Sequence, residues 1–108
     1  MSQHDVFEAL ADPTRRHLVE LLVAGEQSVS ALCVPFSISR TAVSKHLQVL
    51  ADAGVIGARP VGRETRYHLQ PAALRAVGAW VERVAGAIHN QTVAQDRSPA
   101  RAWSPEVD

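Results

Sequence analysis

Polar side chains able to contact DNA bases recur between residues 39 and 48. Arg40 can offer two N–H groups to guanine O6 and N7, and Gln48 can pair with adenine N6 and N7. Thr41, Ser44 and Lys45 share that helical face and fit contacts to bases or phosphates. An ordinary solvated helix face is the alternative when this segment is taken alone.

Three arginines follow in a short segment, Arg59, Arg63 and Arg66, and Glu64 is the only acid among them. Arginines near a loop tip reach phosphates or a narrow minor groove. A solubilising edge hairpin is the alternative, because charge on an edge strand also prevents aggregation. The same sign of charge on the preceding segment favours DNA contact.

Residues 40–53 form the predicted helix that presents the first polar set. Ser39 can cap its N-terminus. An apolar stripe at helical spacing lies opposite the polar face and predicts a buried side, formed by Val43, Leu47 and Leu50. His46 flanks the stripe, so we expect it to pack or hydrogen-bond at the rim, with a phosphate contact as the alternative. Ser39 and His46 complete the predicted DNA-contacting set.

Proline, glycine and capping residues divide the rest of the chain into four more predicted helices and two strands. The helices cover about residues 5–11, 13–24, 28–33 and 71–90, and the strands cover 55–59 and 65–69. A helix, a short turn, a helix and a hairpin occur in this order in a winged helix-turn-helix. We therefore predict a mainly α fold with five helices and a two-stranded wing, in one domain of residues 1–90. Residues 91–108 have no apolar period and predict a flexible tail.

The last predicted helix carries a heptad-like apolar seam, which is typical of a helix that packs against another helix. Its members are Leu74, Val77, Val81, Val84 and Ile88, with Trp80 beside them. A domain of about 100 residues buries only about two-thirds of its unfolded surface, so a partner subunit would add stability.

Composition narrows the class of protein. The chain has 108 residues, 46% of them hydrophobic, and a formal net charge of zero. No apolar run approaches the roughly 18 residues that span a bilayer, and the first residues lack a secretory signal pattern, so we expect no membrane partner. A single cysteine, Cys33, excludes an intramolecular disulfide and fits a reducing cytoplasm. Neutrality does not exclude DNA, because residues 38–68 hold five basic and two acidic residues, a net charge of +3.

Four stretches within about residues 5–89 resemble the ArsR/SmtB family of bacterial repressors, namely residues 7–22, 37–50, 53–56 and 62–67. The Ala-Val-Ser-Lys-His-Leu segment from Ala42 to Leu47 is the most specific part. The resemblance implies a homodimeric repressor that binds a palindromic operator in double-stranded DNA and responds to a signal. Family dimers pair their first and last helices, which implies that Phe7 and Leu10 join the seam at the dimer interface.

The metal ligands of that family are not matched here. Where an arsenic- or cadmium-type site has Cys-Val-Cys, this chain has Cys33, Val34 and Pro35, and its last helix lacks the Asp-x-His and His-x-x-Glu array of the other site. We therefore predict no metal and no other cofactor, with Cys33 as a small core residue. A thiol- or metal-responsive repressor that uses Cys33 is the alternative, and an unidentified small-molecule or redox effector stays open as a partner.

Other classes of function have weaker support. The sequence has no Gly-rich phosphate loop, no zinc-protease His pair and no Gly-x-Ser-x-Gly elbow. We therefore expect that the protein is not an enzyme. A winged-helix adaptor for proteins is a lesser alternative, since its docking face should carry aromatic anchors. Arg15 and Arg16 begin a helix, where cations are disfavoured, so we expect either an ion pair with Asp12 or Glu20 or a bound phosphate.

Overall fold

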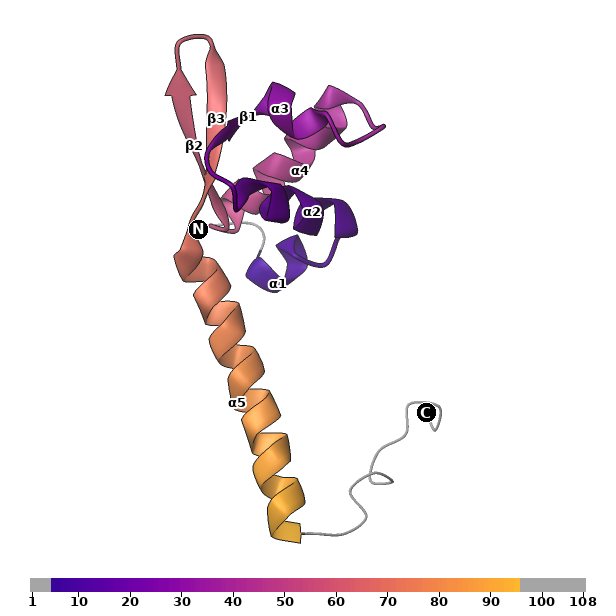
Figure 1. Cartoon of the computed structure of the whole chain (residues 1–108), viewed down its shortest axis with the longest axis vertical. Helices are drawn as coiled ribbons and strands as arrows, with labels where there is room; N and C mark the ends of the chain where they lie inside the picture. Colours follow the sequence, from indigo (N-terminus) through magenta and orange to yellow (C-terminus); the bar gives the residue numbers. More distant parts are fainter. Residues whose placement is uncertain (1–4, 96–108) are drawn as a thin grey trace. The chain divides into compact units, whose positions relative to one another are not determined.

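The computed structural model describes the backbone of residues 5–95 and the side chains of residues 5–88. The chain divides into two units, Met1–Val77 and Gly78–Asp108. The first unit holds four helices and a small sheet, and helix α5 (Pro71–Gln95) continues from it into the second unit (Figure 1).

Aspartate caps begin the first two helices. α1 (Val6–Ala9) follows Asp5, whose carboxylate accepts a backbone N–H at 2.7 Å. α2 (Pro13–Leu22) follows Asp12, whose Oδ1 accepts two backbone N–H groups at 2.7 and 3.1 Å. These bonds satisfy N–H groups that have no partner within their helix, and Pro13 fits the first position because it has no N–H to satisfy.

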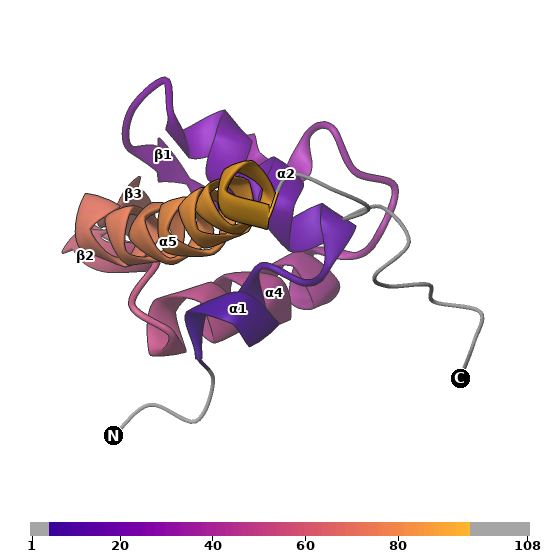
Figure 2. The ribbon, with the colours of Figure 1, turned by 90° about the horizontal axis from the view of Figure 1, so that it is seen from below.

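Serine caps begin the next two helices. α3 (Val29–Cys33) follows Ser28, and α4 (Arg40–Asp52) follows Ser39. Each hydroxyl accepts a backbone N–H three residues further on. α3 packs against α4 as the helix-turn-helix order predicts, and α1 lies beside α4 (Figure 2).

Three antiparallel strands form a sheet in the order β1-β3-β2. They are β1 (Gln27–Ser28), β2 (Ile56–Val61) and β3 (Glu64–Leu69). Gly62 has a φ of +61° and supplies the left-handed conformation that the tight turn between β2 and β3 requires. The register places Arg59 directly opposite Arg66. The wing is therefore a hairpin with a third, very short strand at its β3 edge.

The core of the first unit joins α2, α3, α4 and the start of β2. Its largest fully buried side chains are Leu18, Leu32, Val43, Leu47, Leu50, Val55 and Ile56. The apolar stripe predicted for α4 is confirmed, because its three members are completely inaccessible to solvent. The opposite, polar side of α4 is therefore left in contact with solvent.

Several predicted boundaries were wrong. α1 is shorter than residues 5–11, and α2 ends at Leu22 rather than near residue 24. β2 continues through Pro60, which an edge strand tolerates, so the strands cover 56–61 and 64–69 rather than 55–59 and 65–69. β1 was not predicted, because two residues show no alternation.

The last helix is also longer than predicted. α5 extends to Gln95, so residues 91–95, expected in the tail, are helical. No glycine or proline occurs between residues 87 and 98, so nothing in this stretch interrupts the helix. The remainder of the predicted tail lies outside the described residues. Across residues 5–95, no helix has both the length and the hydropathy needed to cross a membrane.

Candidate nucleic-acid interface

The polar face of α4 is the centre of the candidate site. Thr41, Lys45 and Gln48 are exposed and Ser44 is half-buried, while the opposite side of the helix lies in the core. The Ser39 hydroxyl accepts the Ala42 N–H at 3.0 Å and begins the helix at this point. The helix therefore presents short polar and longer cationic side chains to solvent from a firmly packed support.

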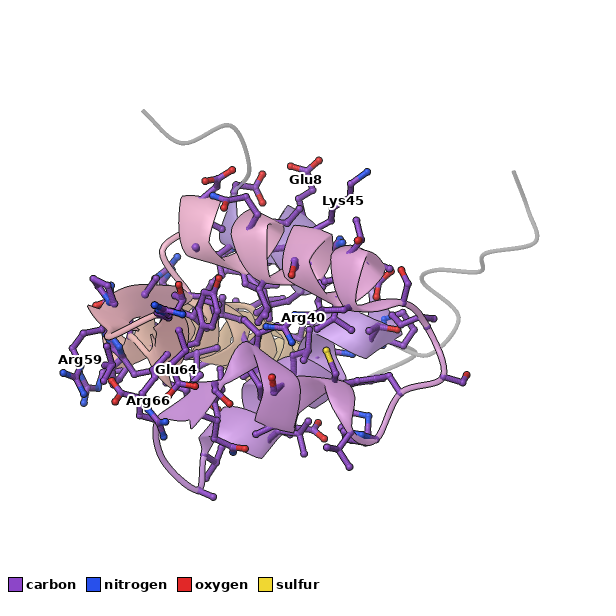
Figure 3. The ribbon with its side chains drawn as sticks, turned by 90° about the horizontal axis from the view of Figure 1, so that it is seen from above. Glu8, Arg40, Lys45, Arg59, Glu64 and Arg66 are labelled. Carbon is purple, nitrogen blue, oxygen red and sulfur yellow. The ribbon has the colours of Figure 1, made fainter. Side chains whose placement is uncertain are left out.

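Two side chains predicted to contact bases already have partners within the chain. Arg40 Nη1 donates to Ser30 Oγ of α3 at 3.0 Å, and Gln48 Nε2 donates to Asp52 Oδ1 at 2.8 Å. Figure 3 shows Arg40 on the side of α4 that faces α3, whereas Lys45 projects away from α3. Each contact occupies one N–H group of its side chain, so a base would have to compete with Ser30 and Asp52 for these two N–H groups.

His46 lies on the flank of α4 that faces α2. It is half-buried, and its Nδ1 accepts a hydrogen bond from Arg15 Nη1 at 3.2 Å, since a guanidinium can only donate. This is the rim hydrogen bond expected for His46, so a role in DNA contact stays a prediction.

Arg15 and Arg16 bind backbone carbonyls, which the sequence did not predict, and phosphate binding by them stays a prediction. Arg15 donates to the carbonyls of Ala9 at 2.7 Å and Glu8 at 3.3 Å, and Arg16 donates to that of Leu10 at 2.7 Å. These carbonyls end α1, where cations are favoured. The two arginines therefore attach α1 to α2, and Asp12 adds only an electrostatic contribution.

Glu26 is the residue that sequence reasoning missed. Its carboxylate accepts two hydrogen bonds from Arg59, at 2.7 and 3.0 Å, and lies 3.3 Å from Arg66 Nε. Arg66 also donates to Glu64 at 3.0 Å. The sequence holds only a weak signal for Glu26: it is the one acidic residue between Glu20 and Asp52.

These contacts change the electrostatics of the wing. The hydrogen bond from Arg59 is the main cause that holds the pKa of Glu26 below its ordinary value, against a smaller effect of desolvation. The same bond raises the pKa of Arg59. Figure 3 shows Arg59, Arg66 and Glu64 gathered on the sheet. Within residues 5–88, Arg63 at the turn forms no ion pair, so it is the wing cation whose charge no carboxylate offsets.

The residues predicted at a dimer interface fall into two groups. In the first unit, Phe7 is 51% exposed, whereas Leu10 and Leu74 pack against the core and Val77 is half-buried. In the second unit, the remaining members of the set are exposed on α5, namely Trp80, Val81, Val84 and Ile88. Large apolar side chains left at the surface in a repeating helical pattern are typical of an interface.

Cys33 is half-buried and packs against the core cluster. Among the described residues, no three His, Cys, Asp or Glu side chains are grouped closely enough to hold a metal ion.

Comparison with known proteins identifies the class. A family model described as a helix-turn-helix domain matches residues 10–56. The chain is 42% identical to the HTH-type transcriptional regulator Rv2034 of Mycobacterium tuberculosis, over 71% of this chain and 72% of that protein. It is 33% identical to the transcriptional repressor SdpR of Bacillus subtilis, over 72% of this chain and 87% of that repressor.

Solved structures agree with these relatives. An ArsR-like transcriptional regulator from Rhodococcus sp. RHA1 superimposes with a TM-score of 0.70 at 35% identity, over 82% of this chain and 84% of that one. A homodimeric winged helix-turn-helix DNA-binding domain from Mycobacterium bovis gives 0.61 at 31% identity, over 75% of each chain. The fold and the polar face of α4 thus define a winged helix-turn-helix regulator of transcription. The chain belongs to the ArsR/SmtB family of these DNA-binding regulators.

Proposed function

We propose that this protein is a homodimeric repressor that occupies a palindromic operator and excludes RNA polymerase. The observation that carries the proposal is the division of α4 into a fully buried apolar side and an exposed polar side. A B-DNA major groove admits one α-helix, and two such helices in a dimer reach half-sites about 34 Å apart. The protein would act in the bacterial cytoplasm, where its DNA lies, and would have no catalytic role.

Individual residues would have different roles at the operator. Thr41, Ser44 and Lys45 would contact bases or phosphates directly, since they are accessible on the outer side of α4. Arg63 at the wing tip would contact a phosphate or the minor groove. Arg40 and Gln48 would reach bases after releasing Ser30 and Asp52.

The dimer would form through the apolar stripe of α5, with a contribution from α1. Val81, Val84 and Ile88 lie on one face of α5 and are exposed, as is Phe7 on α1. The homodimeric state of the related domain from Mycobacterium bovis supports a second copy of this chain as the partner.

A gel-shift titration with DNA from upstream of the protein's own gene tests this function. We expect a complex with two protomers per operator that weakens steeply with salt, because bound phosphates release counterions. Arg40→Ala should cost on the order of 1–3 kcal/mol of operator binding and relax the preference at one base position. Arg75→Ala, an exposed arginine of α5, is the control for loss of charge. Salt-insensitive binding, or no binding to any palindrome, would contradict the proposal.

A further inference from the structure

Two arginines and a histidine surround the carboxylate of Glu26. It lies in the loop between α2 and β1, and three side chains of the hairpin approach it. Arg59 binds both of its oxygens, Arg66 Nε lies 3.3 Å away, and His68 Nδ1 lies 3.8 Å away. Arg66 also donates to the Glu26 backbone carbonyl at 3.3 Å. The loop is thus attached to both long strands of the wing.

The backbone of β2 makes room for this arrangement. Gly57 is paired with His68, and a Cβ at Gly57 would lie only 2.5 Å from His68 Nε2. The missing side chain therefore allows the imidazole to lie across the strand, on the side where it reaches Glu26.

The charges around Glu26 cancel. Arg59 and Arg66 occupy directly opposite positions on β2 and β3, where like charges repel. Glu26 accepts contacts from both and Glu64 binds Arg66, so two carboxylates balance the charge of the two arginines. Arg59 is nevertheless 59% exposed, whereas Glu26 is only 25% exposed. A phosphate could therefore reach Arg59 from solvent, but it would have to compete with Glu26.

We propose that Glu26 is a specificity-determining residue, which restrains Arg59 and Arg66 from DNA phosphates and so lowers the affinity for DNA of arbitrary sequence. An arginine that neutralises a phosphate releases a counterion and strengthens binding without any need for a particular sequence. An arginine that already binds a carboxylate contributes less, because one charge-assisted contact is exchanged for another. Operator recognition then depends mainly on α4 and on Arg63. This inference rests on the proposed function, in which the wing faces DNA.

The test compares Glu26→Gln with the native sequence on an operator duplex and on a random duplex of equal length, by fluorescence anisotropy over a series of salt concentrations. Gln keeps the size and one acceptor of the side chain but removes the charge. We expect affinity for the random duplex to rise on the order of threefold to tenfold, with a salt dependence steeper by about one counterion per freed arginine. Operator affinity should rise less, because base contacts from α4 fix the position of the wing on the operator, whereas on random DNA the freed arginines can settle at the nearest phosphates. The ratio of the two affinities therefore falls.

Two further variants make the result decisive. Glu20→Gln removes an exposed acid of α2 and should leave the affinity ratio unchanged, which controls for net charge. The charge-balanced double variant E26Q/R59Q should lose most of the gain seen with E26Q. The double variant also tests the proposal if E26Q alone does not fold. The proposal expects the affinity of E26Q/R59Q for random DNA to lie within about twofold of the native value.

The opposing outcomes are distinct. Equal weakening on both duplexes by E26Q, or no change, would overturn the proposal, since Glu26 would then position the arginines for DNA or play no part. A marked loss of affinity in the double variant would likewise show that Arg59 binds phosphate in the native protein. Failure of the native protein to prefer the operator would contradict the proposed function itself, and this is measured separately.

Discussion

Asp12 caps α2 and lies close to Arg15, whose side chain contacts both Ala9 of α1 and His46 of α4. Desolvation acts to raise the pKa of Asp12, but hydrogen bonds from the Arg15 and Thr14 N–H groups and the nearby His46 and Arg15 side chains outweigh it. The pKa of Asp12 in the folded protein therefore lies below its ordinary value of 3.8. A carboxylate with a lowered pKa stabilises the fold above the ordinary pKa and loses that effect as the pH falls through the folded pKa.

Asp12→Asn tests this linkage, because Asn still caps a helix but cannot titrate. We expect the native protein to be the more stable of the two at neutral pH. The difference in their free energies of unfolding should be constant near neutral pH and shrink as the pH falls below about 4, from the ordinary pKa through the lower pKa of the folded protein. Urea unfolding followed by circular dichroism at several pH values measures it. A difference that is constant with pH would show that the charge of Asp12 adds nothing.

At the scale of the element, the start of α4 is the feature on which DNA contact depends most. The Ser39 hydroxyl is the side-chain acceptor for the Ala42 N–H, and Arg40 and Thr41 occupy the first turn that it begins. Loss of a serine cap costs about 1 kcal/mol of stability and allows the first turn to fray. A frayed first turn would present its side chains to the groove less precisely.

Ser39→Ala should therefore lower the free energy of unfolding by about 1 kcal/mol and weaken operator binding by more than it weakens binding to random DNA. Ser37→Ala is the control, because Ser37 is exposed in the preceding turn and caps no helix. Thermal unfolding and anisotropy on the two duplexes give both quantities. Equal losses for the two variants would contradict the role assigned to the cap.

Elements with a local signal could be predicted from the sequence, and contacts between distant elements could not. The cap, period and end of α4 lie within one segment, so its bounds and buried stripe were predicted nearly correctly. The carbonyls that bind Arg15 and Arg16 became visible only once α1 was folded against α2. The contact between Glu26 and Arg59 joins residues 33 apart and depends on β1 lying beside β3. Such pairs have no periodicity to reveal them.

At the scale of the whole molecule, the zero net charge of the chain has a spatial meaning. The sequence suggested that basic residues are concentrated in residues 38–68, but Glu26 lies outside that range and binds two of them. The cationic surface of the wing is therefore smaller than the sequence indicated. A regulator with few unpaired cations must obtain its affinity from aimed contacts and from the presence of two half-sites.

Dimerisation should for that reason be a condition for operator binding. Val81 is 46% exposed and lies within the apolar stripe of α5, so we propose that a second copy covers it. Val81→Asp would place a charge in that interface, where an unpaired carboxylate is strongly disfavoured. We expect a monomer by sedimentation velocity, helical content close to native, and at least a tenfold loss of operator affinity.

Ala79→Asp is the control, because residue 79 is exposed on the opposite side of α5. Both variants introduce the same residue, aspartate, into the same helix. It should remain a dimer and bind the operator as the native protein does. If Val81→Asp is also a dimer with native affinity, the α5 stripe is not the interface. If it is monomeric yet binds the operator fully, one copy of α4 and one wing suffice, and the two-half-site mechanism is wrong.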